Sequence, residues 1–181
     1  LQVLSDCKEL KWRNKYIAST DCGINGLATG YRHDSITFQR VKYALEVRKP
    51  KVLFVNFREP DFSGHKGDWN GYIQGIQQTD SMVYAIWKHL QSDPYYQGKT
   101  TMFVTNDHGR HLDGVSNGYV SHGCACEGCR RINLWSFGPD FKQGVSLNQA
   151  AELIDVNATI GELLQLHSLK SNGRVLWELF Q

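Results

Sequence analysis

Two patterns of hydrophobic positions recur along the chain, and each predicts one kind of element. Apolar residues three and four positions apart lie on one face of a helix, and this spacing predicts helices over residues 34–48, 69–90 and about 149–167. Short uninterrupted apolar runs are typical of strands that are covered on both faces, and they predict strands over residues 51–57, 100–105 and 131–137. Pro50 and Pro94 follow the first and second helices and support their ends.

The order of these elements predicts the fold class. Helix, strand, helix and strand follow one another between residues 34 and 105, and this alternation is typical of a parallel sheet with right-handed crossovers. We therefore expect an α/β fold, an αβα sandwich with a mostly parallel sheet. In such sheets ligands bind outside the carboxyl ends of the strands, so we expect metal ligands directly after residues 57 and 105.

The first 33 residues give a weaker pattern. They contain one short apolar run at 15–18 and a segment rich in Gly and Asn at 21–26, which predicts turns. We interpret residues 1–33 as the tail of a missing N-terminal half or as a cap segment. Residues 34–181 form the body of the domain.

Candidate metal ligands follow the predicted strand ends. Their carboxylates and imidazoles are the donors that zinc and similar divalent cations accept, and the five residues are Asp61, His65, Asp107, His108 and His122. Glycines flank all three loops and give the backbone freedom to aim these side chains. A two-metal site needs about three protein ligands for each cation, so the set predicts two bound divalent metal ions.

A cysteine cluster forms a second candidate site. Cys124, Cys126 and Cys129 crowd into six positions, and either His111 or His122 supplies a fourth zinc ligand. The alternatives are a Cys–Cys bond and buried free thiols, the latter being the commonest state of such cysteines. An odd total of five cysteines is no disulfide framework.

The charge and hydropathy of the chain limit the classes of partner that we expect. The formal net charge is +2 and no run of Lys or Arg occurs, so we expect no nucleic-acid partner. The longest apolar runs fall far below the roughly 20 residues that a membrane span needs, so we expect no membrane segment in this chain. A small-molecule substrate fits this composition best.

The motifs resemble those of the alkaline phosphatase superfamily, particularly its nucleotide pyrophosphatase/phosphodiesterase-like members, whose fold is related to that of the sulfatases. The resemblance rests on residues 60–65, 105–109 and 121–123, and it extends to 155–164, with Ala158 where Pro is usual, and to 172–176. It implies that Asp61, His65 and His122 hold one metal. Asp107 and His108 would hold part of the second, and residues 34–181 would be the carboxyl-terminal part of an alkaline-phosphatase-like catalytic domain.

The resemblance implies a metal-dependent hydrolase of phosphate mono- or diesters, acting on a small-molecule phosphate ester. The three histidines in the ligand set favour zinc, with manganese as the alternative. In this family the nucleophile and the remaining second-metal Asp lie in the N-terminal half. We therefore expect a fragment that has no catalytic nucleophile, is inactive alone and depends on the N-terminal half of its own polypeptide.

Three alternatives remain open. A sulfatase-like member would hold a single Ca²⁺ through oxygen ligands, for which three imidazoles are a poor match. A mutase of the same superfamily would share the two metals. A non-catalytic module would use only the cysteine and zinc cluster for interaction. The sequence does not specify the compartment, and only the family resemblance suggests a periplasmic or secreted location.

Overall fold

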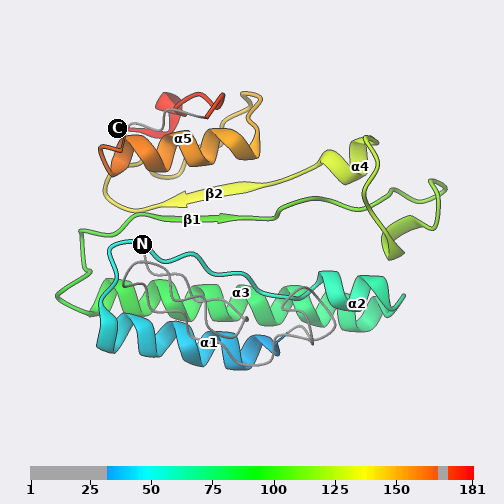
Figure 1. Cartoon of the computed structure of the whole chain (residues 1–181), viewed down its shortest axis with the longest axis horizontal. Helices are drawn as coiled ribbons and strands as arrows, with labels where there is room; N and C mark the ends of the chain where they lie inside the picture. Colours follow the sequence, from blue (N-terminus) through cyan, green and yellow to red (C-terminus); the bar gives the residue numbers. More distant parts are fainter. Residues whose placement is uncertain (1–31, 167–170) are drawn as a thin grey trace. The chain divides into compact units, whose positions relative to one another are not determined.

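The computed structural model describes residues 32–166 and 171–181, which divide into two compact units (Figure 1). Among the described residues, 32–89 and 113–121 belong to the first unit, and the second contains the remainder. The short apolar run at 15–18 and the turns expected at 21–26 lie outside the described residues, as does nearly all of the expected N-terminal tail.

Helices make up most of the first unit. Residues 34–48 are helical as predicted, and the regular helix changes to a π-helical turn before it ends at Lys49, whose φ is 46°. The long second helix is also confirmed. The elements are α1 (Asp34–Tyr43), η1 (Ala44–Arg48), α2 (Asp61–His65), α3 (Trp69–Ser92) and η2 (Gly118–Val120).

Residues 51–57, which we expected to form a central strand, form no regular strand and carry only one bridge position, at Leu53. Their side chains alternate in exposure. Phe54 is 75% exposed, whereas Val55 and Phe57 are partly covered. An apolar run fixes an extended backbone, but only a hydrogen-bonded neighbour makes it a strand. The prediction of a strand covered on both faces is therefore wrong here.

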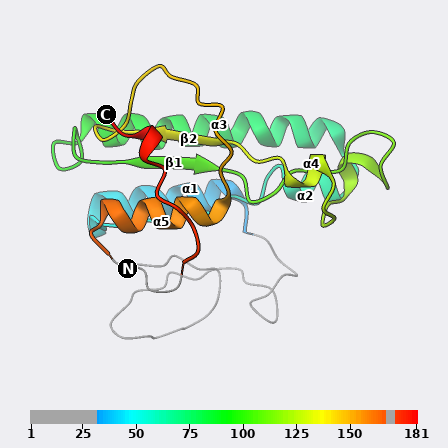
Figure 2. The ribbon, with the colours of Figure 1, turned by 90° about the horizontal axis from the view of Figure 1, so that it is seen from above.

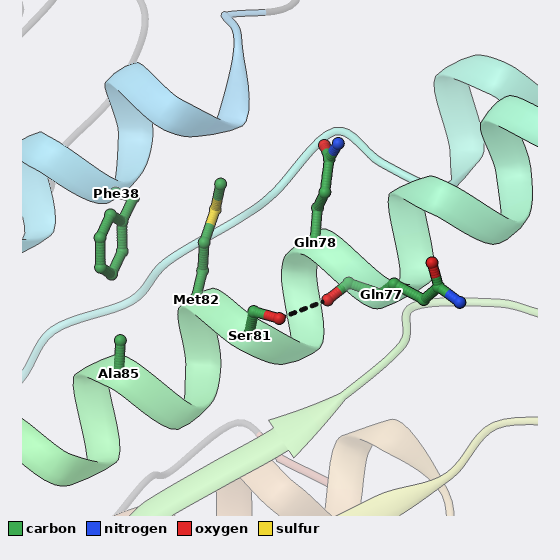
Figure 3. A pocket seen from close by; sticks show the side chains of 6 residues that line it. All are labelled: Phe38, Gln77, Gln78, Ser81, Met82 and Ala85. Atoms are coloured by element: carbon green, nitrogen blue, oxygen red, sulfur yellow. Dashed lines mark hydrogen bonds between the residues drawn. The ribbon is translucent and has the colours of Figure 1, made fainter.

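A shallow open pocket lies beside α1 and α3 (Figure 3). Phe38 of α1 and Met82 and Ala85 of α3 supply its apolar wall, and Ser81 donates a hydrogen bond of 2.8 Å to the carbonyl of Gln77. None of the predicted metal ligands lines this pocket. Among the described helices, none is both long enough and apolar enough to cross a membrane.

The second unit contains a two-stranded sheet, in which β1 (Met102–Thr105) and β2 (Leu134–Phe137) lie side by side (Figures 1 and 2). The strands are antiparallel, with Met102 opposite Phe137. The parallel sheet that the sequence predicts is thus not confirmed in the described residues. The physical reason is the connection: residues 106–133 form a long loop that contains only η2 and a second short helix, α4 (Glu127–Arg130), and return to the same end of the sheet.

The last α-helix of the chain forms where the sequence predicts it. Helix α5 (Leu153–Leu163) falls within the predicted 149–167, and η3 (Trp177–Leu179) follows in the last segment. Phe141 is 2% exposed, and its ring contacts those of Phe103 and Phe180 edge to face at 5.2 and 5.3 Å. These contacts close the core of the second unit against β1.

Candidate metal centres

Asp61 and His65 lie one turn apart on α2, in the first unit. This spacing places both side chains on one face of the helix, with 3.5 Å between Asp61 Oδ1 and His65 Nε2. Both side chains keep contact with solvent, at 32% and 46% exposure. A carboxylate and an imidazole in this relation can bind the same cation, so the helix supplies half of a tetrahedral ligand set.

Contacts at both ends hold α2 in place. The N–H of Ser63 donates to the Glu59 carboxylate at 3.1 Å, which satisfies a free donor of the first turn. After the helix, the Tyr119 hydroxyl donates to the carbonyl of Gly67 at 2.7 Å, and the Tyr119 ring contacts Trp69 edge to face at 4.9 Å. The ligand pair therefore stands on a short helix that is fixed to η2 and the start of α3.

Asp107 and His108 follow directly after β1, in the second unit. Asp107 Oδ2 lies 3.5 Å from His108 Nε2, and Asp107 is 81% exposed. His108 Nδ1 lies 2.9 Å from the carbonyl of Gly109. That bond favours the tautomer with its proton on Nδ1 and leaves the Nε2 lone pair for a metal, which is the usual arrangement of metal-binding histidines.

The imidazole of His122 stacks on that of His108, with 3.6 Å between ring centroids and 19° between planes. The second unit thus brings together three predicted ligands, Asp107, His108 and His122. Asp61 and His65 belong to the first unit. The nitrogen and oxygen donors of all five residues fit zinc or manganese, and each pair is open to solvent on at least one member.

Asn106 orients the backbone at this strand end, although the sequence motifs did not mark it as a functional residue. Its side-chain N–H groups donate to the carbonyls of His108 at 2.9 Å and Arg131 at 3.3 Å, and its oxygen accepts the N–H of Asn133 at 2.9 Å. An amide with both donors and an acceptor can bridge three backbone groups. An Asn directly before an Asp-His pair was the available signal.

The cysteine cluster is compact and lies entirely in the second unit. His111 Nδ1 lies 3.4 Å from the Sγ atoms of Cys124 and Cys126 and 3.3 Å from that of Cys129. The Sγ atoms of Cys124 and Cys129 are 3.8 Å apart. All three cysteines are free thiols, and His111 is buried. Of the two histidines that the sequence left open as the fourth ligand, the structure therefore selects His111.

Two glycines let the backbones of this region approach closely. A Cβ on Gly109 would lie 2.0 Å from the carbonyl oxygen of Gly128, and a Cβ on Gly128 would lie 2.3 Å from that of Arg110. The N–H of Gly109 also donates to the carbonyl of Cys129 at 2.8 Å. The segment that carries Asp107 and His108 is thus bound directly to the cysteine loop.

Comparison with known protein families gives a match to the Metalloenzyme superfamily over residues 15–168. Among curated proteins, the phosphopentomutase of Pseudothermotoga lettingae is 23% identical over 152 residues, which are 82% of this chain and 35% of the relative. The phosphopentomutase of Herpetosiphon aurantiacus is 26% identical over 147 residues, or 81% of this chain and 34% of the relative.

A 2,3-bisphosphoglycerate-independent phosphoglycerate mutase from Nitrosococcus oceani is 33% identical over 66 residues, which are 36% of this chain and 12% of the relative. The chain thus spans about a third or less of the length of these relatives. No solved structure matches the chain significantly.

Proposed function

This chain belongs to the Metalloenzyme superfamily, and from that premise we propose that it is the metal-binding part of a phosphotransferase of the mutase type. The family predicted from the Asp and His motifs is confirmed at this level. The proposed reaction moves a phosphoryl group between two positions of a small phosphorylated substrate. The observation that carries the proposal is the similarity to phosphopentomutases over four fifths of the chain.

The relatives change the preferred reaction from the one that the sequence favoured. The Asp and His motifs favoured hydrolysis of phosphate mono- or diesters, with a mutase among the alternatives. The relatives named above are mutases, which supports the mutase reading better. The two reactions share the activation of a phosphate ester and differ in the final acceptor, a substrate hydroxyl or water.

The ligand roles remain those implied by the family resemblance. Asp61, His65 and His122 would hold one divalent cation, and Asp107 and His108 would contribute to a second. Such cations stabilise the negative charge that develops on phosphoryl oxygens during transfer. Zinc is our first choice and manganese the alternative, because both accept imidazole together with carboxylate.

Several features of this chain's own residues support these roles. The carbonyl of Gly109 fixes the ring of His108, and the side chain of Asn106 donates a hydrogen bond to the backbone carbonyl of His108. His122 stacks on that ring at 3.6 Å. Two cations of a phosphoryl-transfer site lie about 3.5–4 Å apart, so ligands of neighbouring metals must also lie close together, as these two rings do.

The test follows a pentose phosphate and a phosphoglycerate by ³¹P NMR, using the full-length polypeptide that carries this sequence, with Zn²⁺ or Mn²⁺ present. We expect a positional isomer to appear without release of inorganic phosphate. His65→Ala should slow this conversion by at least roughly tenfold, the smallest effect expected even for an outer-shell partner of a metal. Lys66→Ala is the matched control, since Lys66 is the exposed neighbour at the same helix end.

Two results would overturn the proposal. Stoichiometric release of inorganic phosphate would identify a hydrolase instead. Consumption of neither substrate, at any concentration of either metal, would exclude the phosphopentose and phosphoglycerate chemistry of the relatives.

A further inference from the structure

We propose that His111, Cys124, Cys126 and Cys129 form a second, structural metal site that binds zinc. This site is separate from the Asp and His ligands described above and uses none of them. It stands independently of the proposed mutase activity, because it is argued from the sulfur and nitrogen donors alone.

The distances fit a tetrahedral zinc ion. With Zn–S bonds of about 2.3 Å and a Zn–N bond of about 2.0 Å, a regular tetrahedron separates sulfur from sulfur by about 3.8 Å and sulfur from nitrogen by about 3.5 Å. The structure has 3.8 Å between the Sγ atoms of Cys124 and Cys129, and 3.3–3.4 Å from His111 Nδ1 to each of the three sulfurs. One nitrogen thus faces three sulfurs at ligand-to-ligand spacing.

The donor set selects zinc over other divalent cations. Three thiolates and one imidazole make one of the common structural zinc sets, whereas Mg²⁺ and Ca²⁺ require oxygen donors. All four positions of a tetrahedron are filled by protein, so the site is closed and leaves no position for a substrate. Burial of His111 and Cys129 agrees with a structural rather than a catalytic role.

The local backbone is also arranged around this centre. Cys126 precedes α4 and Cys129 lies within it, while the N–H of Cys126 points to the sulfur of Cys124 at 3.3 Å. Backbone N–H groups that point to sulfur are a usual feature of thiolate metal sites, because they offset the negative charge of the ligand.

The position of the site suggests what it does. His111 is three residues after His108, and Cys124 is two residues after His122. A zinc ion bound to His111 and to the three cysteines would fix the loop from Gly109 to Cys129. It would also keep the rings of His108 and His122 stacked on each other. The proposed zinc is therefore a clamp between the segment after β1, which presents Asp107 and His108, and the loop segment after η2, which presents His122.

The test uses the full chain, purified under reducing conditions without a metal-affinity step. Elemental analysis should find about one tightly held zinc per chain, and X-ray absorption at the zinc edge should show three sulfur neighbours and one nitrogen. Cys129→Ser and His111→Ala should retain zinc at least roughly tenfold less well against a chelator. His111→Cys should keep it, since four thiolates are an equally good set. Cys22→Ser, outside the described residues, is the control and should behave as the wild type.

A measurement on the unmodified chain covers the case in which a variant fails to fold. Addition of Co²⁺ to the reduced, metal-free chain should give the intense thiolate-to-cobalt absorption of a tetrahedral site. Absence of this absorption band would overturn the proposal. So would bound zinc that has no sulfur neighbours, or a disulfide between two of the three cysteines in protein purified under reducing conditions.

Discussion

The backbone N–H of Gly109 donates to the carbonyl of Cys129 at 2.8 Å, which joins the segment after β1 to the cysteine loop. Gly109→Ala should break this joint, because its Cβ would lie 2.0 Å from the Gly128 carbonyl oxygen. We expect a loss of about 2–3 kcal/mol in unfolding free energy from the forced backbone shift, measured by urea denaturation, and weaker retention of zinc.

Gly144→Ala is the matched control in the same unit. Nothing lies within 4 Å of its Cβ, and its φ of 66° predicts only the left-handed strain of about 1–2 kcal/mol. Zinc retention should not change. Equal zinc loss in the Gly109→Ala and Gly144→Ala variants would show that the close packing at Gly109 is not needed for zinc binding.

Zinc should stabilise the second unit by linkage. A ligand that binds only the folded state at a thousand times its dissociation constant adds about 4 kcal/mol of unfolding free energy. Thermal unfolding of the metal-free chain should therefore shift upward as zinc is added. Most of this shift should be lost in Cys129→Ser, whose sulfur is one of the three around His111 Nδ1. Magnesium in place of zinc should leave the cysteine site empty and give no such difference between the two proteins.

Thr159 joins α5 to the carboxyl-terminal segment. Its hydroxyl has no solvent exposure, donates to the carbonyl of Asp155 at 2.7 Å and accepts the N–H of Leu176 at 3.0 Å. Thr159→Val preserves the side-chain shape but leaves that buried N–H without an acceptor, at a cost of about 1–3 kcal/mol. Thr159→Ser keeps the hydroxyl and should lose less, about 1 kcal/mol for the missing methyl group. A Ser variant no more stable than the Val variant would contradict the role of the hydroxyl.

Asp34 gives a prediction for pH. Burial raises the pKa of its carboxyl group, and the N–H groups of Arg58 and Glu59, at 2.8 and 3.1 Å, oppose this rise. With a raised pKa the folded state binds more protons than the unfolded state just above the ordinary pKa of 3.8. The contribution of Asp34 to stability is therefore complete below that value and is lost as pH rises through the folded pKa.

Urea unfolding from about pH 3 to about pH 6, across the ordinary range of Asp, checks this sign. The stability difference between wild type and Asp34→Asn should shift in favour of the Asn variant as pH rises. Asp80→Asn, at an exposed position of α3, should show no such trend. An opposite slope for Asp34 would mean that the two hydrogen bonds outweigh burial.

Elements that depend on neighbouring residues could be predicted from the sequence, whereas pairings between distant segments could not. The helices over 34–48 and 69–90 followed from local apolar spacing, and local spacing also located Asp107 and His108 at the end of β1. The direction of β1 relative to β2 depends on a loop of about 28 residues, for which no local pattern exists, so the antiparallel pairing was not predicted and the parallel sheet is not confirmed in the described residues. The strand at 51–57 was wrong for the same reason, since pairing is a property of two segments.

The cysteine cluster was found from sequence, but its fourth member was not. Both His111 and His122 stayed open as the fourth ligand, although the family resemblance assigns His122 to the Asp and His metal site. The close approach of Gly109 and Gly128, together with the short helix α4, directs His111 to the sulfurs and leaves His122 against His108. Such a choice depends on packing between backbones thirteen or more residues apart, which a one-dimensional motif does not contain.

The central claim is that one chain carries two kinds of metal site, and elemental analysis after equilibrium dialysis of three proteins tests it most directly. In wild type we expect zinc at both sites, and in His65→Ala loss of the metal bound through nitrogen and oxygen with the thiolate-bound zinc retained. In Cys129→Ser we expect loss of the thiolate-bound zinc together with weaker binding at the other site, because the clamp on His108 and His122 is missing. Loss of the thiolate-bound zinc from His65→Ala, or its retention in Cys129→Ser, would contradict the account.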